Sequence, residues 1–161
     1  MIRLGKEKGL RIAIFTNGVN IPLNILEICD EYYISLDGSE EIHNLIRGNN
    51  KAYRQTVNSL KVLNKLNKKI IIQTTISKWN IQHLYELIPI YKEFLPNLEQ
   101  INLEGVINQG AAVVNALGIS EDELELIGKF KERILEELGF KVWVKDNLYS
   151  KEQIKKFLIQ L

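Results

Sequence analysis

The segment Lys69-Ile-Ile-Ile-Gln-Thr-Thr-Ile76 constrains the fold of this chain more than any other. Its three successive isoleucines, Ile70 to Ile72, are typical of a β-strand buried on both faces, because a strand with one wet face alternates apolar and polar residues. Strands buried in this way belong to parallel sheets that other elements cover. The segment therefore indicates the α/β fold class.

Strand and helix patterns alternate along the rest of the chain. Strands are predicted at 10–15, 32–36, 69–76, 99–103 and 140–144, and helices at 22–29, 51–66, 80–91, 120–138 and from 150 onward. Asn80 is expected to cap its helix, Ser120 and Glu123 to form a capping box, and Gly139 to end the helix that this box opens. This βαβα order suits a doubly wound sheet or a (β/α) barrel. A complete barrel needs roughly 250 residues, so only an open or partial barrel fits in 161.

Composition narrows the function classes. The length of 161 residues predicts a single domain over 1–161. Lys+Arg is 21 and Asp+Glu is 20, so the charge does not favour a nucleic-acid partner. No apolar run approaches a membrane span and no secretory signal is visible, so we expect no membrane partner and a cytoplasmic location. The single cysteine, Cys29, excludes an internal disulfide or a multi-cysteine metal site, and we expect it to be a small buried residue.

Polar residues gather where the predicted strands end. These residues are Thr16, Asn17, Ser35, Asp37, Thr74, Thr75, Glu104 and Asn108. In parallel α/β folds, functional residues lie at the carboxyl ends of the strands, so this rim is a candidate site. For any single residue the alternative is ordinary turn chemistry.

Two carboxylate–histidine pairs have helical spacing but predict no metal site. Glu40-x-x-His43 and His83-x-x-Glu86 each supply fewer ligands than a metal centre needs, and solvated helix faces are the preferred interpretation. No residue is assigned as catalytic, because Cys29 has no evident histidine partner and no nucleophile motif is present.

Several motifs together resemble a known family. They are Thr16-Asn-Gly18, Ile34-Ser-Leu-Asp-Gly38, Glu41-Ile-His43, Ile46-Arg-Gly48, Tyr53-x-x-Thr56, Thr74-Thr-Ile76 with Asn80, and Gly110-Ala111. Their order and spacing resemble the second half of the radical S-adenosylmethionine (radical SAM) core. The nearest branch is the peptide- and protein-modifying enzymes related to sulfatase maturases. The likeness covers about residues 8–145.

The resemblance implies a partial TIM-like barrel with five parallel strands in sequential order, helices on the outer face, and the first two βα units missing. The family's C-x-x-x-C-x-x-C loop, which holds a [4Fe–4S] cluster, and its GGEP-like segment are not in the sequence. The implied parent reaction is reductive cleavage of SAM to a radical that abstracts hydrogen from a peptide or other substrate. The chain by itself is expected to be catalytically inactive, so whether it counts as an enzyme stays open.

The resemblance also implies six cofactor-binding positions around SAM: Ser35, Arg47, Asn17, Asp37, Thr75 and Asn80. The first two match positions that hold the SAM carboxylate, which a hydroxyl and a guanidinium can both bind. The next two match rim positions near SAM or substrate, and the last two match positions near the ribose and adenine.

Two other interpretations stay open. A non-enzymatic binding or interaction module would keep the fold without the chemistry, and an in-frame cluster motif in the DNA upstream of Met1 would decide against it. An unrelated nucleotide binder would be favoured if ATP bound better than SAM. We also expect self-association, because a barrel without two βα units exposes a strand edge and its inner face.

Overall fold

Five strands form one parallel sheet in the computed structural model, which describes residues 2–106, 117–120, 122–140 and 142–145. The strands are β1 (Ala13–Thr16), β2 (Glu31–Ser35), β3 (Lys69–Ile76), β4 (Leu98–Gly105) and β5 (Val142–Val144). They lie in the order β1-β2-β3-β4-β5, and every neighbouring pair is parallel. The predicted strand number, direction and sequential order are therefore confirmed.

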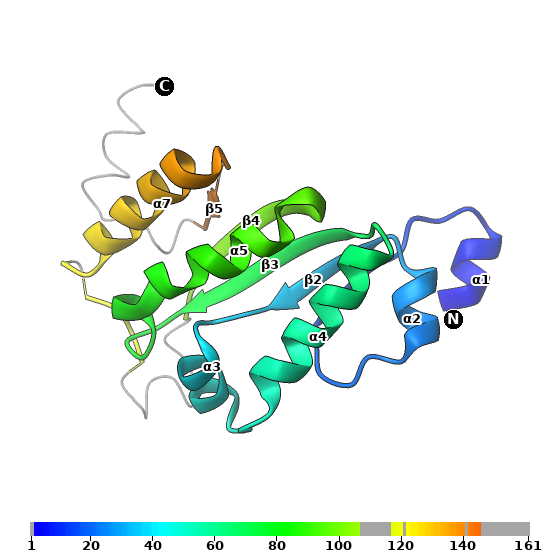
Figure 1. The fold of residues 1–161 in the computed structure, drawn as a ribbon, viewed down its shortest axis with the longest axis horizontal. Helices are drawn as coiled ribbons and strands as arrows, with labels where there is room; N and C mark the ends of the chain where they lie inside the picture. The colour runs from blue at the N-terminus through cyan, green and yellow to red at the C-terminus, as the bar shows by residue number, and fades with distance from the viewer. Residues whose placement is uncertain (1, 107–116, 121, 141, 146–161) are drawn as a thin grey trace.

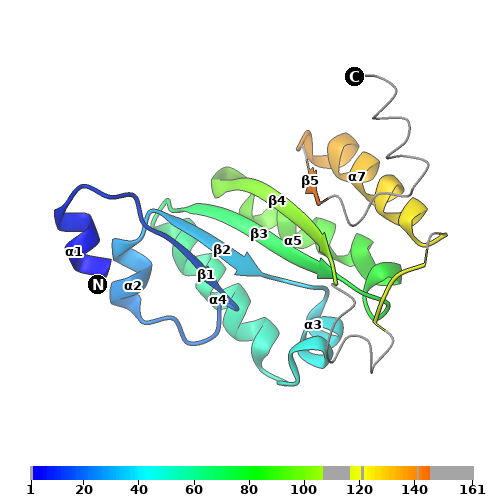
Figure 2. The ribbon, with the colours of Figure 1, turned by 180° about the vertical axis from the view of Figure 1, so that it is seen from behind.

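The larger helices cover one face of this sheet. The helical segments are α1 (Ile2–Glu7), α2 (Leu23–Ile28), α3 (Glu40–Arg47), α4 (Ala52–Lys65), the 3₁₀ helix η1 (Ile81–Leu87), α5 (Ile88–Phe94), the 3₁₀ turn η2 (Leu95–Asn97) and α7 (Leu124–Leu138). In Figure 1, α3, α4, α5 and α7 lie in front of the strands. Seen from behind in Figure 2, the strands lie in front of those helices, which confirms helical cover on the outer face. Within the described ranges, no helix combines the length and apolar content needed to cross a membrane.

The core lies between the helices and the sheet. Ile70 and Ile72 of β3 are fully buried, and Ile71, which points to the opposite face, is 3% exposed. This confirms the prediction of a strand buried on both faces. Tyr32 of β2 is also fully buried, and its hydroxyl donates to the main-chain oxygen of Ile25 in α2 at 2.7 Å. The core therefore includes a polar tie between β2 and α2.

Local signals set several boundaries correctly. Glu123 accepts a hydrogen bond from the Ser120 N–H at 2.8 Å, and the Ser120 hydroxyl accepts one from the Glu123 N–H at 3.4 Å. This is the predicted capping box. Gly139 follows α7 with φ of 62°, a left-handed conformation that glycine adopts without a steric penalty.

Other boundaries differ from the prediction. β1 begins at Ala13 rather than residue 10, and β4 runs from Leu98 to Gly105 rather than 99–103, because neighbouring strands determine how far each ladder extends. The predicted helix after Asn80 is the 3₁₀ helix η1 followed by α5. Asn80 makes no side-chain cap bond, so the capping prediction is wrong. Asn108, Gly110-Ala111 and the helix predicted from Ser150 lie outside the described residues.

Candidate functional site

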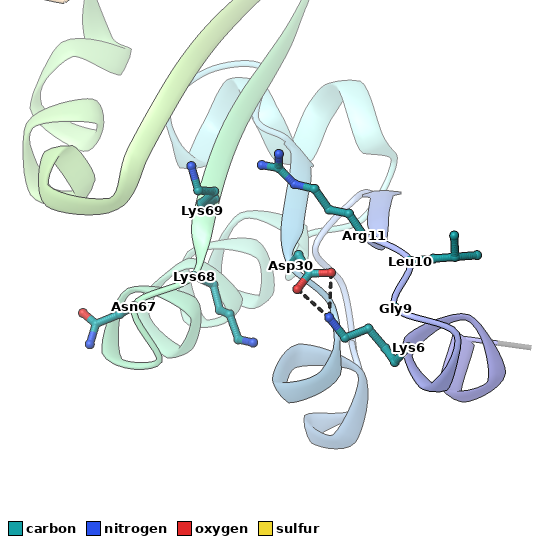
Figure 3. A pocket seen from close by; sticks show the side chains of 8 residues that line it. All are labelled: Lys6, Gly9, Leu10, Arg11, Asp30, Asn67, Lys68 and Lys69. Atoms are coloured by element: carbon teal, nitrogen blue, oxygen red, sulfur yellow. Dashed lines mark hydrogen bonds and ion pairs between the residues drawn. The ribbon is translucent and has the colours of Figure 1, made fainter.

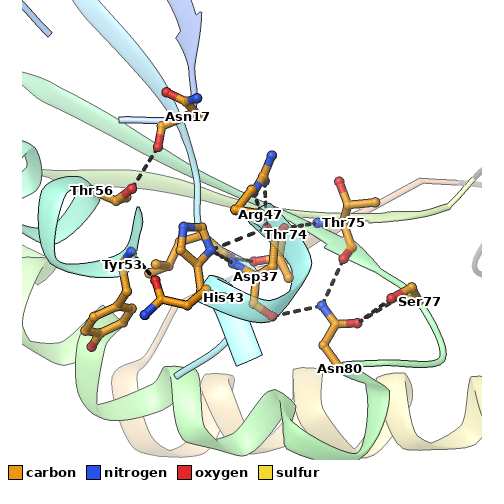
Figure 4. A network of polar contacts seen from close by, with 12 residues as sticks. Asn17, Asp37, His43, Arg47, Tyr53, Thr56, Thr74, Thr75, Ser77 and Asn80 are labelled. Carbon is orange, nitrogen blue, oxygen red and sulfur yellow. Dashed lines mark hydrogen bonds and ion pairs between the residues drawn. The ribbon is translucent and has the colours of Figure 1, made fainter. Parts of the chain in front are cut away.

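A fully buried aspartate joins three elements at the carboxyl end of the sheet. Asp37 follows β2, and its Oδ2 accepts a hydrogen bond from Arg47 Nε at 2.7 Å and lies 2.6 Å from Arg47 Nη2. Its Oδ1 accepts a hydrogen bond from the Thr75 N–H at 3.1 Å. One carboxylate thus links the end of β2, the last residue of α3 and the end of β3, as Figure 4 shows.

The main chain of Asp37 is fixed by a buried histidine. The Asp37 N–H donates to Nδ1 of His43, which is fully buried on α3, at 3.1 Å. Since Nδ1 accepts this bond, the proton of the neutral ring is on Nε2. Nε2 has no hydrogen-bond partner within the described part of the chain. The interpretation of Glu40 and His43 as a solvated helix face is therefore wrong for His43.

Asn80 ties the same aspartate to the loop after β3. Its amide nitrogen donates to the main-chain oxygens of Asp37 at 2.8 Å and Thr75 at 2.9 Å. Its Oδ1 accepts from the Ser77 N–H at 2.8 Å. Asn80 is fully buried and bridges two loops, and its Oδ1, the atom that would cap a helix, is engaged by the Ser77 N–H. Four predicted site residues, Asp37, Arg47, Thr75 and Asn80, are therefore brought together.

Asn17 belongs to a separate turn that packs on α4. Its Oδ1 accepts from the Val19 N–H at 3.0 Å, and its main-chain oxygen accepts from the Thr56 hydroxyl at 2.7 Å. The next residue, Gly18, has φ of +77°, and a Cβ there would lie 3.1 Å from Thr56 Cα. This close approach and the left-handed backbone explain the glycine in the Thr-Asn-Gly turn. None of these bonds reaches Asp37 (Figure 4).

Ser35 lies on the helix-free face of the sheet. Tyr32 and Ile34 of β2 are buried toward the helices, so Tyr33 and Ser35 face the other way. In register with Ser35 lie Gln73, Asn102 and Trp143 on successive strands. This places one hydroxyl and two amides in a row across the sheet.

Further polar groups extend this row toward the carboxyl ends. Gln73 Nε2 donates to Glu104 Oε2 at 3.0 Å, and the Lys145 ammonium pairs with the other oxygen of Glu104. We call the helix-free-face residues Ser35, Gln73, Thr75, Asn102, Glu104 and Lys145 the inner-face patch. Sequence reasoning missed Gln73, Asn102 and Lys145, although a polar residue inside an apolar strand is a usable signal for the first two.

Aromatic side chains flank the inner-face patch. Phe15 of β1 stacks on Tyr33 of β2, with ring centroids 4.1 Å apart and planes inclined by 18°. Phe15 is 71% exposed and Trp143 of β5 is 51% exposed. Exposed aromatic rings on a sheet face are unusual for a surface that meets only water. The helix-free face thus has the composition of a contact surface.

The geometry defines what this rim can bind. The Arg47 side chain is 30% exposed, and Asp37 uses two of the five N–H donors that a guanidinium carries. The remaining donors can bind an anionic oxygen. Because Asp37 already neutralises the arginine, such binding relies on directed hydrogen bonds more than on net charge.

The second carboxylate–histidine pair is an exposed contact. His83 Nδ1 lies 2.9 Å from Glu86 Oε1, with both side chains more than two-fifths exposed. Hydrogen bonds from Ser39 and then His83 hold the pKa of Glu86 below its usual range. Among the described residues, no group of three or more His, Cys, Asp and Glu side chains could hold a metal ion.

The fold and rim define a class: a parallel (β/α) partial barrel with polar groups at the carboxyl ends of its strands. No protein-family model matches the chain. The AdoMet-dependent heme synthase of Methanosarcina barkeri, whose name refers to SAM, is 31% identical over 97 residues, 56% of this chain and 28% of that protein. The sporulation killing factor maturation protein SkfB of Bacillus subtilis is 24% identical over 82 residues, 48% of this chain and 20% of that protein. The chain thus spans less than a third of either relative.

The solved structure of native anSMEcpe with bound AdoMet and Kp18Cys peptide has the same fold. It superposes with a TM-score of 0.67 and 16% identity, over 88% of this chain and 42% of that chain. The sequence relatives and the shared fold support a radical SAM superfamily domain, most like the peptide-modifying branch. The resemblance seen in the sequence motifs is therefore confirmed.

Proposed function

We propose that this chain supplies SAM- and substrate-positioning residues of a radical SAM domain that modifies a peptide or other substrate. The observation that supports this proposal most is the position of the Arg47 guanidinium. The buried Asp37 holds it at the carboxyl end of the sheet, and part of the Arg47 side chain is exposed to solvent. Ser35 precedes Asp37 by two residues and faces the helix-free side. A hydroxyl and a partly free guanidinium fit the carboxylate of SAM.

The six cofactor-binding residues divide by exposure under this proposal. Ser35 and Arg47 would contact the SAM carboxylate directly. Asp37 and Asn80 are fully buried, so they would act by positioning Arg47 and the loop after β3. Thr75 lies on the inner-face patch, where it is open to the ribose or adenine, and Asn17 shapes the rim turn beside β1.

An iron–sulfur cluster does not fit the residues of this chain. A [4Fe–4S] cluster is held by several cysteine thiolates, whereas the sequence has one cysteine. Cys29 is fully buried between α2 and β2. No step of the proposed function therefore runs through a cluster held here, and we expect the 161 residues alone to be catalytically inactive.

The proposed substrate surface is the inner-face patch with its aromatic flanks. The relatives include a killing factor maturation protein, and one structural neighbour has a bound peptide, which supports a peptide or protein substrate. We also propose self-association through β1, which pairs with β2 on one side only among the described strands and exposes Phe15. A cytoplasmic location remains part of the proposal.

Calorimetric titration with SAM tests this assignment. Arg47→Met and Ser35→Ala should each weaken binding by about tenfold, as expected for one lost charge-assisted or polar contact. Arg54→Met is the matched control, because Arg54 pairs with Glu40 on the outer helices and is 75% exposed. SAM binding that neither site variant weakens would refute the assignment.

The single cysteine also supports a second candidate, a non-enzymatic binding module that keeps the fold. Absence of SAM binding together with binding of a peptide to the inner-face patch would favour it. Tighter binding of ATP than of SAM would instead favour a nucleotide binder.

A further inference from the structure

Two aspartates, one at each end of β2, are held in different ways. Asp30 precedes the strand, and its main-chain N–H donates to the main-chain oxygen of Ile12 at 2.9 Å. Its carboxylate accepts from the Lys6 ammonium at 2.7 and 2.9 Å, as Figure 3 shows. Asp37 follows the strand and lies past Ile34, the last residue of β2 that is in register with β1. A buried N–H beyond the end of that ladder needs another acceptor.

His43 supplies this acceptor from α3. Its Nδ1 lies 3.1 Å from the main-chain nitrogen of Asp37, and both residues are fully buried. Nδ1 is also 3.4 Å from Oδ2 of Asp37, so a carboxylate in place of the ring would repel the aspartate, whereas a neutral imidazole accepts the bond without charge. A Cβ on Gly38 would lie 2.7 Å from Cγ2 of Ile42, which shows how closely α3 packs on this loop. The His43 bond and this packing together set the position of α3.

The same helix also holds the carboxylate of Asp37. Arg47 lies four residues after His43, so both side chains project from one face of α3. The histidine binds the main chain of Asp37, while Nε and Nη2 of the arginine lie 2.7 and 2.6 Å from its Oδ2. One helix face thus holds the aspartate at two points, as Figure 4 shows. The N–H groups of Nη1 and the second N–H of Nη2 remain for a ligand.

We propose that His43 is a positioning residue for the rim, and that the bond to its Nδ1 sets how tightly Arg47 binds a ligand carboxylate. This inference rests on the proposed function, in which that carboxylate belongs to SAM. Without the Nδ1 bond the main chain of Asp37 can turn, and its carboxylate no longer fixes the direction of the guanidinium donors. Asn80 does not replace the acceptor, because its amide nitrogen binds the main-chain oxygen of Asp37 at 2.8 Å and its own oxygen accepts from Ser77. Nε2 of His43 has no hydrogen-bond partner within the described ranges, so the ring acts through Nδ1.

Two substitutions of matched shape test this role in the full chain. His43→Asn keeps an acceptor at the position of Nδ1, whereas His43→Leu has nearly the same shape without one. In NMR spectra without SAM, the Nε–H of Arg47 should exchange with water about tenfold faster in His43→Leu and less than about threefold faster in His43→Asn. In calorimetric titration, His43→Leu should raise the dissociation constant of SAM about tenfold, and His43→Asn less than about threefold.

Tyr32→Phe is the control for a general loss of stability. It removes the buried hydrogen bond from the Tyr32 hydroxyl to α2 and should change both measurements by less than about twofold. Equal effects of the two His43 variants, or an equal effect of Tyr32→Phe, would refute the role of Nδ1. A proton–nitrogen spectrum that places the ring proton of the parent chain on Nδ1 would also refute it, whether or not His43→Leu folds. The exchange of the Arg47 Nε–H is measured without SAM, so a parent chain that does not bind SAM would refute the proposed function and leave the test of His43 in force.

Discussion

The Asp37–Arg47 pair gives a sharp test of how the rim is built. Arg47→Met removes both contacts to Oδ2 and leaves a carboxylate with no exposed surface, supported by the Thr75 N–H at 3.1 Å. Removing one partner of a buried pair costs about 3–5 kcal/mol. Because the Thr75 N–H bond remains and Arg47 is 30% exposed, we expect the free energy of unfolding to fall by about 3 kcal/mol, the lower end of this range.

Substitution of the other partner, Asp37, should lower the free energy of unfolding by less. Asp37→Asn keeps the shape and removes the charge, and the remaining guanidinium can reach water, so we expect a loss of about 2 kcal/mol. The double variant strands no buried charge. The free energy of unfolding of the double variant should fall by about 3 kcal/mol. The two single losses would add to roughly 5 kcal/mol, so the coupling energy between Asp37 and Arg47 is about 2 kcal/mol.

Urea denaturation followed by circular dichroism measures all four unfolding free energies. The control cycle uses Lys61→Met and Glu93→Gln, an exposed pair at 3.5 Å whose coupling should stay below about 0.5 kcal/mol. A coupling between Asp37 and Arg47 as small as in the control would show that the buried carboxylate does not hold the arginine.

Further outcomes are expected elsewhere in the chain. Gly18→Ala should destabilise the protein by about 1–3 kcal/mol, because φ is +77° and the α4 backbone is close. Gly128→Ala is the control and should not destabilise it, because a Cβ at this position of α7 meets open space. Equal effects of the two substitutions would contradict this. A main-chain N–H and then the Lys6 ammonium hold the pKa of Asp30 below its model-compound value of 3.8, so its stabilisation is present above that pH and lost as pH falls through the lowered pKa. Lys6→Met should flatten that part of the stability profile in acid titration. Burial raises the pKa of the Cys29 thiol, so Ellman's reagent should react only as the protein unfolds, and fast reaction in native buffer would contradict this. Sedimentation showing only monomer at high micromolar concentration would refute self-association through β1.

Local chemistry explains what could be predicted from the sequence. Lys69–Ile76 was predicted with its correct bounds, since an apolar run that follows a polar turn leaves little choice of where the strand begins and ends. Gly139 and the capping box likewise act through bonds within a few residues. The six positions came from the resemblance, and four of them do meet.

Contacts formed in the folded chain explain the features that could not be predicted from the sequence. Asn80 is suited to cap a helix, but its Oδ1 accepts from the Ser77 N–H, and its amide nitrogen donates to the main-chain oxygen of Asp37, 43 residues away along the chain. His43 has the spacing of a surface residue and is buried because α3 packs on the loop after β2. Gln73 acquires its role from Glu104 on the next strand. The Asp37 and Glu104 partners lie 43 and 31 residues away along the chain, outside any local window of sequence.

The sequential strand order also has a consequence for how the chain acquires its structure. Among the described strands, every strand pairs only with the strands that precede and follow it in the chain, so each ladder closes the connection between two consecutive strands. Loop-closure entropy is therefore lower than in a sheet whose neighbouring strands are out of chain order, and we expect the sheet to grow strand by strand. A mutation that slows one ladder should delay its neighbours and leave the far edge unaffected, so pulse-labelled hydrogen exchange would show protection spreading outward from β3 and β4.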